Sequence, residues 1–367
     1  MMLYKLLSRT NRTRFEPAVI SLSDHGTLGE QIEGLGIPVI SIGMKRGRPT
    51  LTGIWRLIAA ARELKPNIIQ GWMYHGNLAA QLAGFFRPGQ TVVLWNIRQS
   101  LYSLSYEKRA TAAVIKIGSY LSRFPAYIIY NSKTSACQHE AIGYRAGARV
   151  FIPNGFDTAG FSPSDEARQS VRSELGIAED AFLIGLICRY HPMKDHEMFL
   201  KAVSLLLESN SNVHFVLAGD RVDNNNVELR KRIHHLKLSN HVHLLGERRD
   251  ISRLTAALDI GVSSSSYAEG FPNVIGEAMS CAVPCVVTDV GDSALIVGDT
   301  GMVVQPRDPL SLAYACQKLI DMGKDRLQEM GKRARRRIVD RFSLEYIVQH
   351  YEHLYGQMEH VKQEECE

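Results

Sequence analysis

The chain has 367 residues, of which 45% are hydrophobic and 22% charged, a composition typical of globular protein with material for about two domains. It contains no apolar run of about 18 residues, and its first ten residues lack the features of a secretory signal. The six cysteines and thirteen histidines are not spaced as metal ligands. We therefore expect a cytoplasmic protein without a bound metal or other cofactor.

Charge is distributed unevenly between the two halves of the chain. Residues 1–157 contain 19 Lys and Arg against 8 Asp and Glu, whereas residues 158–367 contain 24 against 30. A solvated basic surface explains this excess, and so does attraction to an anionic membrane face or a phosphate-bearing acceptor. The cations are dispersed and accompany no nucleic-acid-binding motif, so a nucleic-acid partner is not expected.

In the first half, short runs rich in Val and Ile alternate with segments of helical period. The expected strands are residues 17–22, 37–41, 67–70, 91–95, 126–130 and 149–152. Between them, residues 51–65 and 106–124 are typical of amphipathic helices. This alternation indicates a parallel sheet covered by helices on both faces.

After the Gly- and Pro-containing segment 152–163 the same alternation starts again. The expected strands are residues 182–188, 213–219, 241–245, 259–264, 284–288 and 301–304. We expect an N-terminal domain over 1–157, a second domain over 158–342, and a packing helix with a tail over 343–367. Two doubly wound domains in tandem are expected to bind ligands in a cleft at the carboxyl ends of their strands.

The segment from Glu269 to Asp292 places two carboxylates, Glu269 and Glu277, eight residues apart. Pro272 favours a helix start near Asn273, with the helix running to about Cys281. The free backbone N–H groups of Phe271, Asn273 and Val274 would then form an anion site at the helix N-terminus. We expect a phosphate to bind there.

Two cations follow the expected strand 182–188. Arg189 comes directly after it, and Lys194 stands at the entrance to the next helix, beyond Pro192. An Arg and a Lys at the carboxyl end of a strand suit a diphosphate. The alternative is an ordinary surface pair.

Together these segments resemble family 4 of the retaining glycosyltransferases, which belong to the group 1 enzymes of polysaccharide synthesis. The family's R-x4-K-type loop matches Arg189 and Lys194, and its E-x7-E motif matches Glu269 and Glu277. The resemblance extends over essentially the whole chain, including residues 72–77, 152–157, 244–250 and 287–292. It implies the GT-B fold, with two Rossmann-like domains facing each other across a cleft.

The resemblance also implies roles for these residues. Arg189 and Lys194 would hold the donor diphosphate, Glu277 the ribose, and Glu269 the sugar ring. The loop from Gly246 to Arg248 would offer backbone groups to the base. The implied reaction moves a sugar from a nucleotide diphosphate, UDP in our hypothesis, to a glycan or lipid-linked acceptor of surface polysaccharide or lipopolysaccharide, with retention and without metal.

The candidates for contact with the acceptor lie in the first half of the chain. His75 is expected in a loop after the strand 67–70, where it either faces the cleft or is structural. Relatives often carry a catalytic-site His after the strand corresponding to 91–95, whereas this chain has Asn96 and Arg98 there. Arg98 is therefore a candidate for contact with a phosphate or a sugar oxygen.

The family also opens with a strand and a glycine-rich loop, whereas residues 1–9 resemble the helix that follows them. We therefore expect two inner strands of the first domain to lack a partner. One alternative function is nucleotide-sugar binding with little or no turnover. Another, a sugar-nucleotide epimerase, fits less well, because the first half offers no acid and base carboxylate set.

Overall fold

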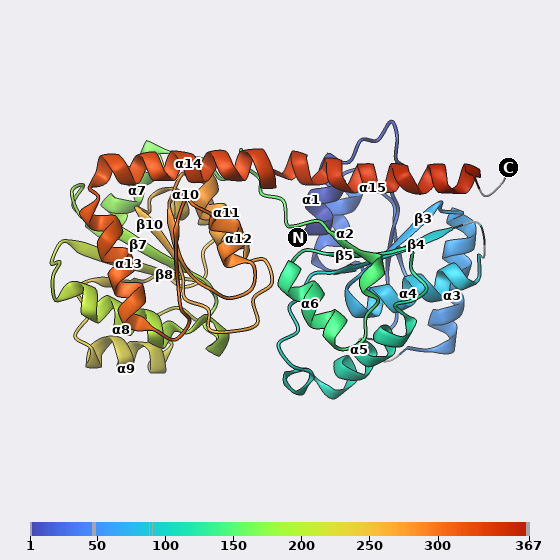
Figure 1. Ribbon diagram of the computed structural model, residues 1–367, viewed down its shortest axis with the longest axis horizontal. Helices are drawn as coiled ribbons and strands as arrows, with labels where there is room; N and C mark the ends of the chain where they lie inside the picture. The colour runs from blue at the N-terminus through green and yellow to red at the C-terminus, as the bar shows by residue number, and fades with distance from the viewer. Residues whose placement is uncertain (1, 46–48, 88, 90, 365–367) are drawn as a thin grey trace. The chain divides into compact units, whose positions relative to one another are not determined.

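The computed structural model describes residues 2–45, 49–87, 89 and 91–364 (Figure 1). The chain separates into two compact units. Unit 1 consists of Met1–Gly155 with Leu344–Glu367, and unit 2 of Phe156–Ser343. The chain therefore passes between the units twice, and each unit is described by itself below.

Unit 1 contains two parallel sheets. One pairs β1 (Val19–Ser21) with β2 (Val39–Ser41), and the other has the order β3 (Ile68–Trp72), β4 (Val92–Ile97), β5 (Tyr127–Tyr130), β6 (Arg149–Phe151). Among the described residues β1 pairs only with β2, and β3 only with β4. Each of these two strands thus keeps one edge without a strand partner.

The helices of unit 1 connect these strands and cover the four-stranded sheet. They are α1 (Met2–Arg9), α2 (Gly26–Glu33), α3 (Leu51–Leu64), α4 (Met73–Phe85), η1 (Leu104–Tyr106), α5 (Arg109–Leu121), α6 (Lys133–Ala141), η2 (Ala146–Ala148) and α15 (Leu344–Glu364). Side chains of β4 alternate between the two faces, as the pleat of a strand requires. Trp95 packs in the cluster that includes residues of α4, α5 and α6, whereas Leu94 packs against α15.

The C-terminal helix α15 belongs to unit 1. Its apolar row buries Ile347, Tyr351 and Leu354 against the β3–β6 sheet, together with Leu6 of α1. With α15 counted there, unit 1 has 20 Lys and Arg against 13 Asp and Glu, and unit 2 has 23 against 25. The contrast between a basic and an acidic half is therefore weaker than the linear sequence indicates, because the acidic tail packs with the basic unit.

Unit 2 is built on one six-stranded parallel sheet. Its order is β12 (Met302–Val304), β11 (Cys285–Thr288), β10 (Ile260–Ser263), β7 (Phe182–Ile187), β8 (Val213–Ala218), β9 (Val242–Leu244). Its helices are α7 (Asp165–Leu175), η3 (Pro192–Lys194), α8 (His196–Leu207), α9 (Val227–His235), α10 (Ile251–Ala256), α11 (Asn273–Ser280), α12 (Ser293–Val297), α13 (Pro309–Asp321) and α14 (Lys324–Phe342).

The strand order of unit 2 reverses between β7 and β10. From β7 the chain builds outward through β8 and β9, and from β10 it builds outward in the other direction through β11 and β12. At such a reversal the loops that follow the two central strands diverge and leave a crevice at the carboxyl edge of the sheet. All twelve expected strands are confirmed to within two residues at each end.

Candidate functional site

The reversal point of unit 2 brings together two of the expected site residues. Lys194 ends η3, after β7, and Glu269 lies in the loop between β10 and α11. The Lys194 ammonium forms an ion pair with Glu269 Oε1, and Ser265 Oγ donates to the same oxygen at 2.7 Å. The two charged side chains are only 16% and 10% exposed. A cation and an anion are therefore held at the crevice with little solvent around them.

Serines that follow β10 fix the backbone around this pair. Ser264 Oγ donates to the carbonyl of Lys194 at 2.7 Å, and the Ser266 N–H donates to the carbonyl of Met193 at 2.8 Å. Thr288, at the end of β11, donates to the carbonyl of Ser265 at 2.6 Å. These serines were not among the residues predicted from the sequence, although a run of four serines, which begins at the last residue of β10, was a visible signal.

Arg189 is exposed in the loop after β7, and a neighbouring glycine shapes that loop. Gly219, which follows β8, has φ 149°, and a Cβ there would overlap the carbonyl oxygen of Cys188. The N–H of Tyr190 donates to the carbonyl of Asp220 at 2.8 Å. The loops after β7 and β8 therefore pack backbone against backbone, which only glycine permits at position 219.

Burial suppresses the reactivity of the Cys188 thiol and the charge of His196, which lie beside this loop. Their side chains approach to 3.7 Å. Burial raises the pKa of Cys188 to about 12 and lowers the pKa of His196 to about 4. Near neutral pH the cysteine is therefore a thiol and the histidine is uncharged, so neither supplies a nucleophile or a cation.

Helix α11 begins at Asn273, directly after Pro272, whose side chain makes no capping hydrogen bond. Glu277 lies in its second turn and is partly exposed. The loop before α11 is held by its neighbour, because Asp292 N donates to the carbonyl of Gly270 at 2.8 Å. Gly291, with φ 62°, makes this approach possible, since a Cβ there would lie 2.5 Å from the carbonyl oxygen of Glu269.

The expected anion site at the start of α11 consists of backbone groups. Phe271 is buried, and its ring lies 6.1 Å from that of Phe156 and 5.6 Å from that of Phe342. Its side chain is therefore part of the core. The expected contribution of Phe271 to this site is therefore limited to its backbone.

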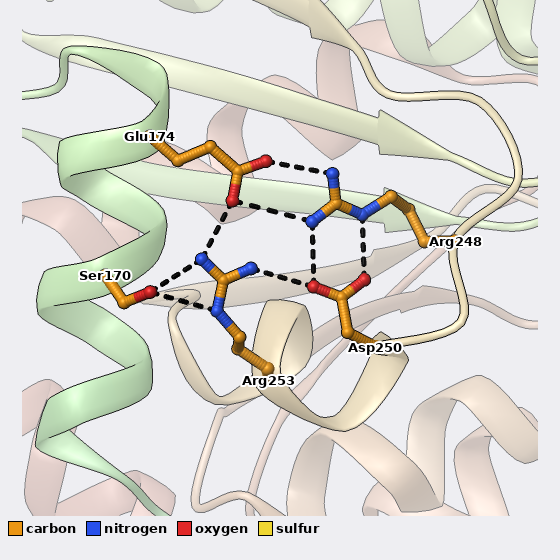
Figure 2. A network of polar contacts seen from close by, with 5 residues as sticks. All are labelled: Ser170, Glu174, Arg248, Asp250 and Arg253. Atoms are coloured by element: carbon orange, nitrogen blue, oxygen red, sulfur yellow. Dashed lines mark hydrogen bonds and ion pairs between the residues drawn. The ribbon is translucent and has the colours of Figure 1, made fainter.

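Arg248 lies in a network of ion pairs that anchors the loop after β9 (Figure 2). Its guanidinium contacts Asp250 at 2.7 Å and Glu174 of α7 at 2.9 Å, and Arg253 of α10 contacts the same two carboxylates. The hydrogen bonds that Arg248 donates, first to Asp250 and then to Glu174, raise the pKa of Arg248. Its side chain therefore holds the loop, whose backbone groups remain the candidates for contact with a base.

Gly246 opens the same loop and joins it to the loops after β8. Its N–H donates to the carbonyl of Val222 at 2.9 Å, and its carbonyl accepts from Gly219 N at 2.8 Å. The loops after β7, β8 and β9 thus form one connected rim along the carboxyl edge of the sheet.

In unit 1 the expected acceptor-side residues occupy different environments. His75 is exposed in the first turn of α4, so the expectation of a loop position is wrong: the helix starts at Met73, directly after β3. Asn96 is inaccessible to solvent, and its amide donates to the Tyr351 hydroxyl of α15 at 2.9 Å. Such a buried, hydrogen-bonded amide joins the sheet to α15 and is not placed to meet a ligand.

Arg98 is partly buried at the end of β4. Its guanidinium donates to Tyr351 at 2.9 Å and to Asn154, and it lies 5.5 Å from the centroid of the Trp72 ring. The Arg98 side chain is thus held by contacts within unit 1. A contact with an acceptor would require some of these contacts to be exchanged.

In the described parts of the chain, no group of three or more His, Cys, Asp or Glu side chains is arranged to hold a metal ion. No helix of the described residues combines the length and apolar character needed to cross a membrane.

Two family models match the chain and together cover most of it. Residues 1–159 match Glycosyltransferase Family 4, and residues 181–322 match Glycosyl transferases group 1. The chain belongs to the group 1, family 4 glycosyltransferases. The residues of this glycosyltransferase that form the crevice in unit 2 lie within the second match.

Curated relatives and a solved structure are similar to this glycosyltransferase over different lengths. A putative glycosyltransferase, EpsF of Bacillus subtilis, is 36% identical over 138 residues, which are 38% of this chain and only 35% of that protein. The UDP-Gal:alpha-D-GlcNAc-diphosphoundecaprenol alpha-1,3-galactosyltransferase of Escherichia coli is 27% identical, over 77% of this chain and 72% of its own. The crystal structure of Anabaena HepE in complex with UDP has a TM-score of 0.84 at 25% identity and covers 97% of this chain and 95% of that one. The fold is therefore GT-B.

Proposed function

We propose that this glycosyltransferase moves a sugar from a UDP-sugar to a glycan or lipid-linked acceptor in the synthesis of cell-surface polysaccharide or lipopolysaccharide. The observation that carries the proposal is the ion pair of Lys194 with Glu269, four residues before the start of α11 and at the reversal point of the sheet. The names of two similar proteins support the choice of donor and acceptor. One is solved with UDP, and the other is named for transfer from UDP-galactose to a diphosphoundecaprenol-linked sugar.

In this proposal the donor diphosphate binds where positive charge gathers. Arg189 and Lys194 supply two cations, and the first N–H groups of α11 supply the positive end of a helix dipole. When a phosphate oxygen takes the ammonium of Lys194, Glu269 is released to accept a hydrogen bond from the sugar. Glu277 accepts hydrogen bonds from the ribose, and the backbone of Gly246 to Arg248 contacts the base.

The chemical step then depends on stabilising the leaving group. The bond between the anomeric carbon and the phosphate oxygen breaks, and its electron pair stays on the nucleoside diphosphate, where Arg189 and Lys194 stabilise the charge. The acceptor hydroxyl attacks from the same face and gives its proton to a phosphate oxygen, so the configuration is retained. Glu269 positions the sugar, and the paired cations make a metal unnecessary.

A lipid-linked acceptor also places the enzyme at a membrane. We propose that it acts in the cytoplasm, peripherally at the inner face of the cell membrane. The surplus of Lys and Arg in unit 1, 20 against 13 Asp and Glu, supports attraction to anionic lipids.

The test is nucleotide release from a panel of UDP-, GDP- and ADP-sugars, with and without a polyprenyl-diphosphate-linked sugar, in the presence and absence of EDTA. We expect UDP release that requires the acceptor and is unchanged by EDTA, with an α-linked product from an α-linked donor. Tight UDP binding without release would instead indicate a nucleotide-sugar-binding protein. Release from GDP- or ADP-sugars alone would contradict the proposed donor.

A further inference from the structure

The outward face of α5 in unit 1 carries an apolar row that nothing covers among the described residues. Ala113, Ile117 and Tyr120 recur at intervals of four and three, and Phe124 continues the row just beyond the helix. Ile117 is 50% exposed, Tyr120 76% and Phe124 47%. The opposite face of α5 buries Ile115 in the core of unit 1. The helix therefore carries apolar side chains on two opposite faces, one buried in the core and one exposed.

A row of cations runs beside this apolar row. Arg109 and Lys116 are seven residues apart, which places them on one side of the helix, and Arg123 follows seven residues later, just beyond its end. No Asp or Glu occurs from Arg109 to Phe124. The guanidinium carbon of Arg123 lies 5.2 Å from the centroid of the Phe124 ring.

The ends of α4 and α3 extend this patch. Phe85 and Phe86, 48% and 45% exposed, end α4, and the Phe85 ring meets that of Phe124 edge to face at 5.1 Å. Arg62 of α3 lies 5.9 Å from the centroid of the Phe86 ring. We call the residues of this continuous patch the α5 surface: Ile117, Tyr120, Phe124, Phe85 and Phe86, with the cations Arg62, Lys116 and Arg123.

The chemistry of the α5 surface fits one kind of partner. Exposed aromatic and aliphatic side chains beside Lys and Arg, without acids on the helix, are typical of helices that lie in the headgroup region of a bilayer. Tyr and Phe rings enter the interface while the long cationic side chains reach lipid phosphates. A symmetric contact between two copies would place one basic row against another, which disfavours self-association through this face.

We propose that the α5 surface docks this enzyme on an anionic lipid bilayer. The inference rests on the proposed function in one respect only, the expectation of a lipid-linked acceptor. The α5 surface belongs to unit 1, whereas the proposed donor-binding residues belong to unit 2. Its cations attract the bilayer, and its apolar row then enters the interface.

A matched pair of double variants tests the proposal. Lys116→Glu with Tyr120→Ser alters the α5 surface, and Tyr314→Ser with Lys318→Glu removes the same groups, at the same spacing of four, from the exposed face of α13 in unit 2. Each variant is mixed with vesicles of phosphatidylglycerol and phosphatidylcholine, or of phosphatidylcholine alone, and sedimented. We expect the wild type and the α13 variant to bind the anionic vesicles, and the α5 variant to bind at least about tenfold more weakly.

Three controls keep the result specific. Melting temperature shows whether each variant folds, and Arg123→Glu alone serves as a milder variant if the double variant does not. UDP titration is expected to give the same affinity for all of them, so a failure of UDP binding in the wild type would count against the proposed function and not against this surface. Salt above about 0.15 M, where the Debye length is near 8 Å, should weaken the sedimentation of the wild type.

Three outcomes would overturn the inference. The first is equal sedimentation of the α5 variant and the wild type, and the second is equal binding of the wild type to neutral and anionic vesicles. The third is a dimer, seen by analytical ultracentrifugation, that the α5 variant loses while vesicle binding persists, which would assign the surface to a second copy of the chain.

Discussion

The ring of Phe156 packs directly on Gly276 in the middle of α11, so closely that a Cβ at position 276 would overlap the ring. Phe156 is the first residue of unit 2, and its N–H donates to the carbonyl of Phe342, the last residue of α14, at 2.9 Å. The segments where the chain enters and leaves unit 2 are thus packed on the helix that carries Glu277. The position of Glu277 depends on this contact.

Replacing Gly276 with Ala should displace either the Phe156 ring or α11. We expect the free energy of unfolding to fall by about 1 to 3 kcal/mol, the usual cost of overpacking, and the affinity for UDP to fall because Glu277 is the next residue. Urea unfolding and calorimetry measure the two effects. The matched control is Gly147→Ala in unit 1, where nothing lies within 4 Å of the added Cβ. If adding Phe156→Leu restores the stability of the Gly276→Ala variant, the clash with the Phe156 ring is confirmed as the cause. Equal losses of stability in the two glycine variants would contradict it.

Lys194→Ala should lower turnover more than it lowers the affinity for UDP. Loss of one charge-stabilising donor raises the barrier by about 2 to 4 kcal/mol, and we expect the same range for Arg189→Ala. The control is Lys201→Ala, which removes a cation from the exposed face of α8, where it pairs with Glu197 at 2.9 Å. Unchanged kcat at saturating donor, with weakened UDP binding, would show that the two cations act only in the ground state.

The two carboxylates should differ in their kinetic signatures. Glu277→Gln is expected to raise KM for the donor more than it lowers kcat, because ribose is bound equally in the ground state and the transition state. Glu269→Gln should chiefly lower kcat, because in the proposed mechanism this side chain positions the reacting sugar, and it pairs with Lys194. Steady-state kinetics on both variants, with exposed Glu329→Gln of α14 as control, measure the difference. Identical effects of the two changes on UDP binding would refute this division.

The network around Arg248 should make unit 2 less stable in acid. Hydrogen bonds from Arg248, and then from Arg253, lower the pKa of Glu174, and hydrogen bonding from Arg248 lowers the pKa of Asp250. Because both pKa values are depressed in the folded state, the stabilisation is present above the ordinary carboxyl range near 4 and is lost as the pH falls through and below it.

We therefore expect Glu174→Gln to lower the free energy of unfolding at pH 7 by less than about 1 kcal/mol, since the Glu174 side chain is 36% exposed. The difference from wild type should shrink at about pH 3, below the ordinary carboxyl pKa, because the unfolded wild-type chain there binds a proton that folded Glu174 binds only at lower pH. Urea midpoints at both pH values test this, again with Glu329→Gln as control. If the difference in the free energy of unfolding stays constant with pH, the charge of the Glu174 carboxylate contributes nothing to stability.

Local sequence signals were sufficient for the strands and for the start of α11, but not for the helix that begins at Met73. Runs of Val and Ile specify buried parallel strands wherever they occur, and Pro272 fixes the start of α11 through its own backbone geometry. The positions of Lys194 and Glu269 relative to the strand ends follow from the same local signals. Their pairing across 75 residues then follows from the strand order, which places β7 beside β10.

Which partner each side chain meets was decided only by the tertiary structure. The sequence predicted the apolar row of α15 from its helical period, but nothing in that period says that the row packs on the sheet of unit 1, about 190 residues or more earlier in the chain. The hydrogen bonds of Asn96 with Tyr351 and of Arg248 with Glu174 likewise join residues that are far apart in sequence. Periodicity and propensity report the conformation of a few consecutive residues, whereas hydrogen bonds and ion pairs require atoms within about 3 Å, and that proximity exists only after the sheets have assembled.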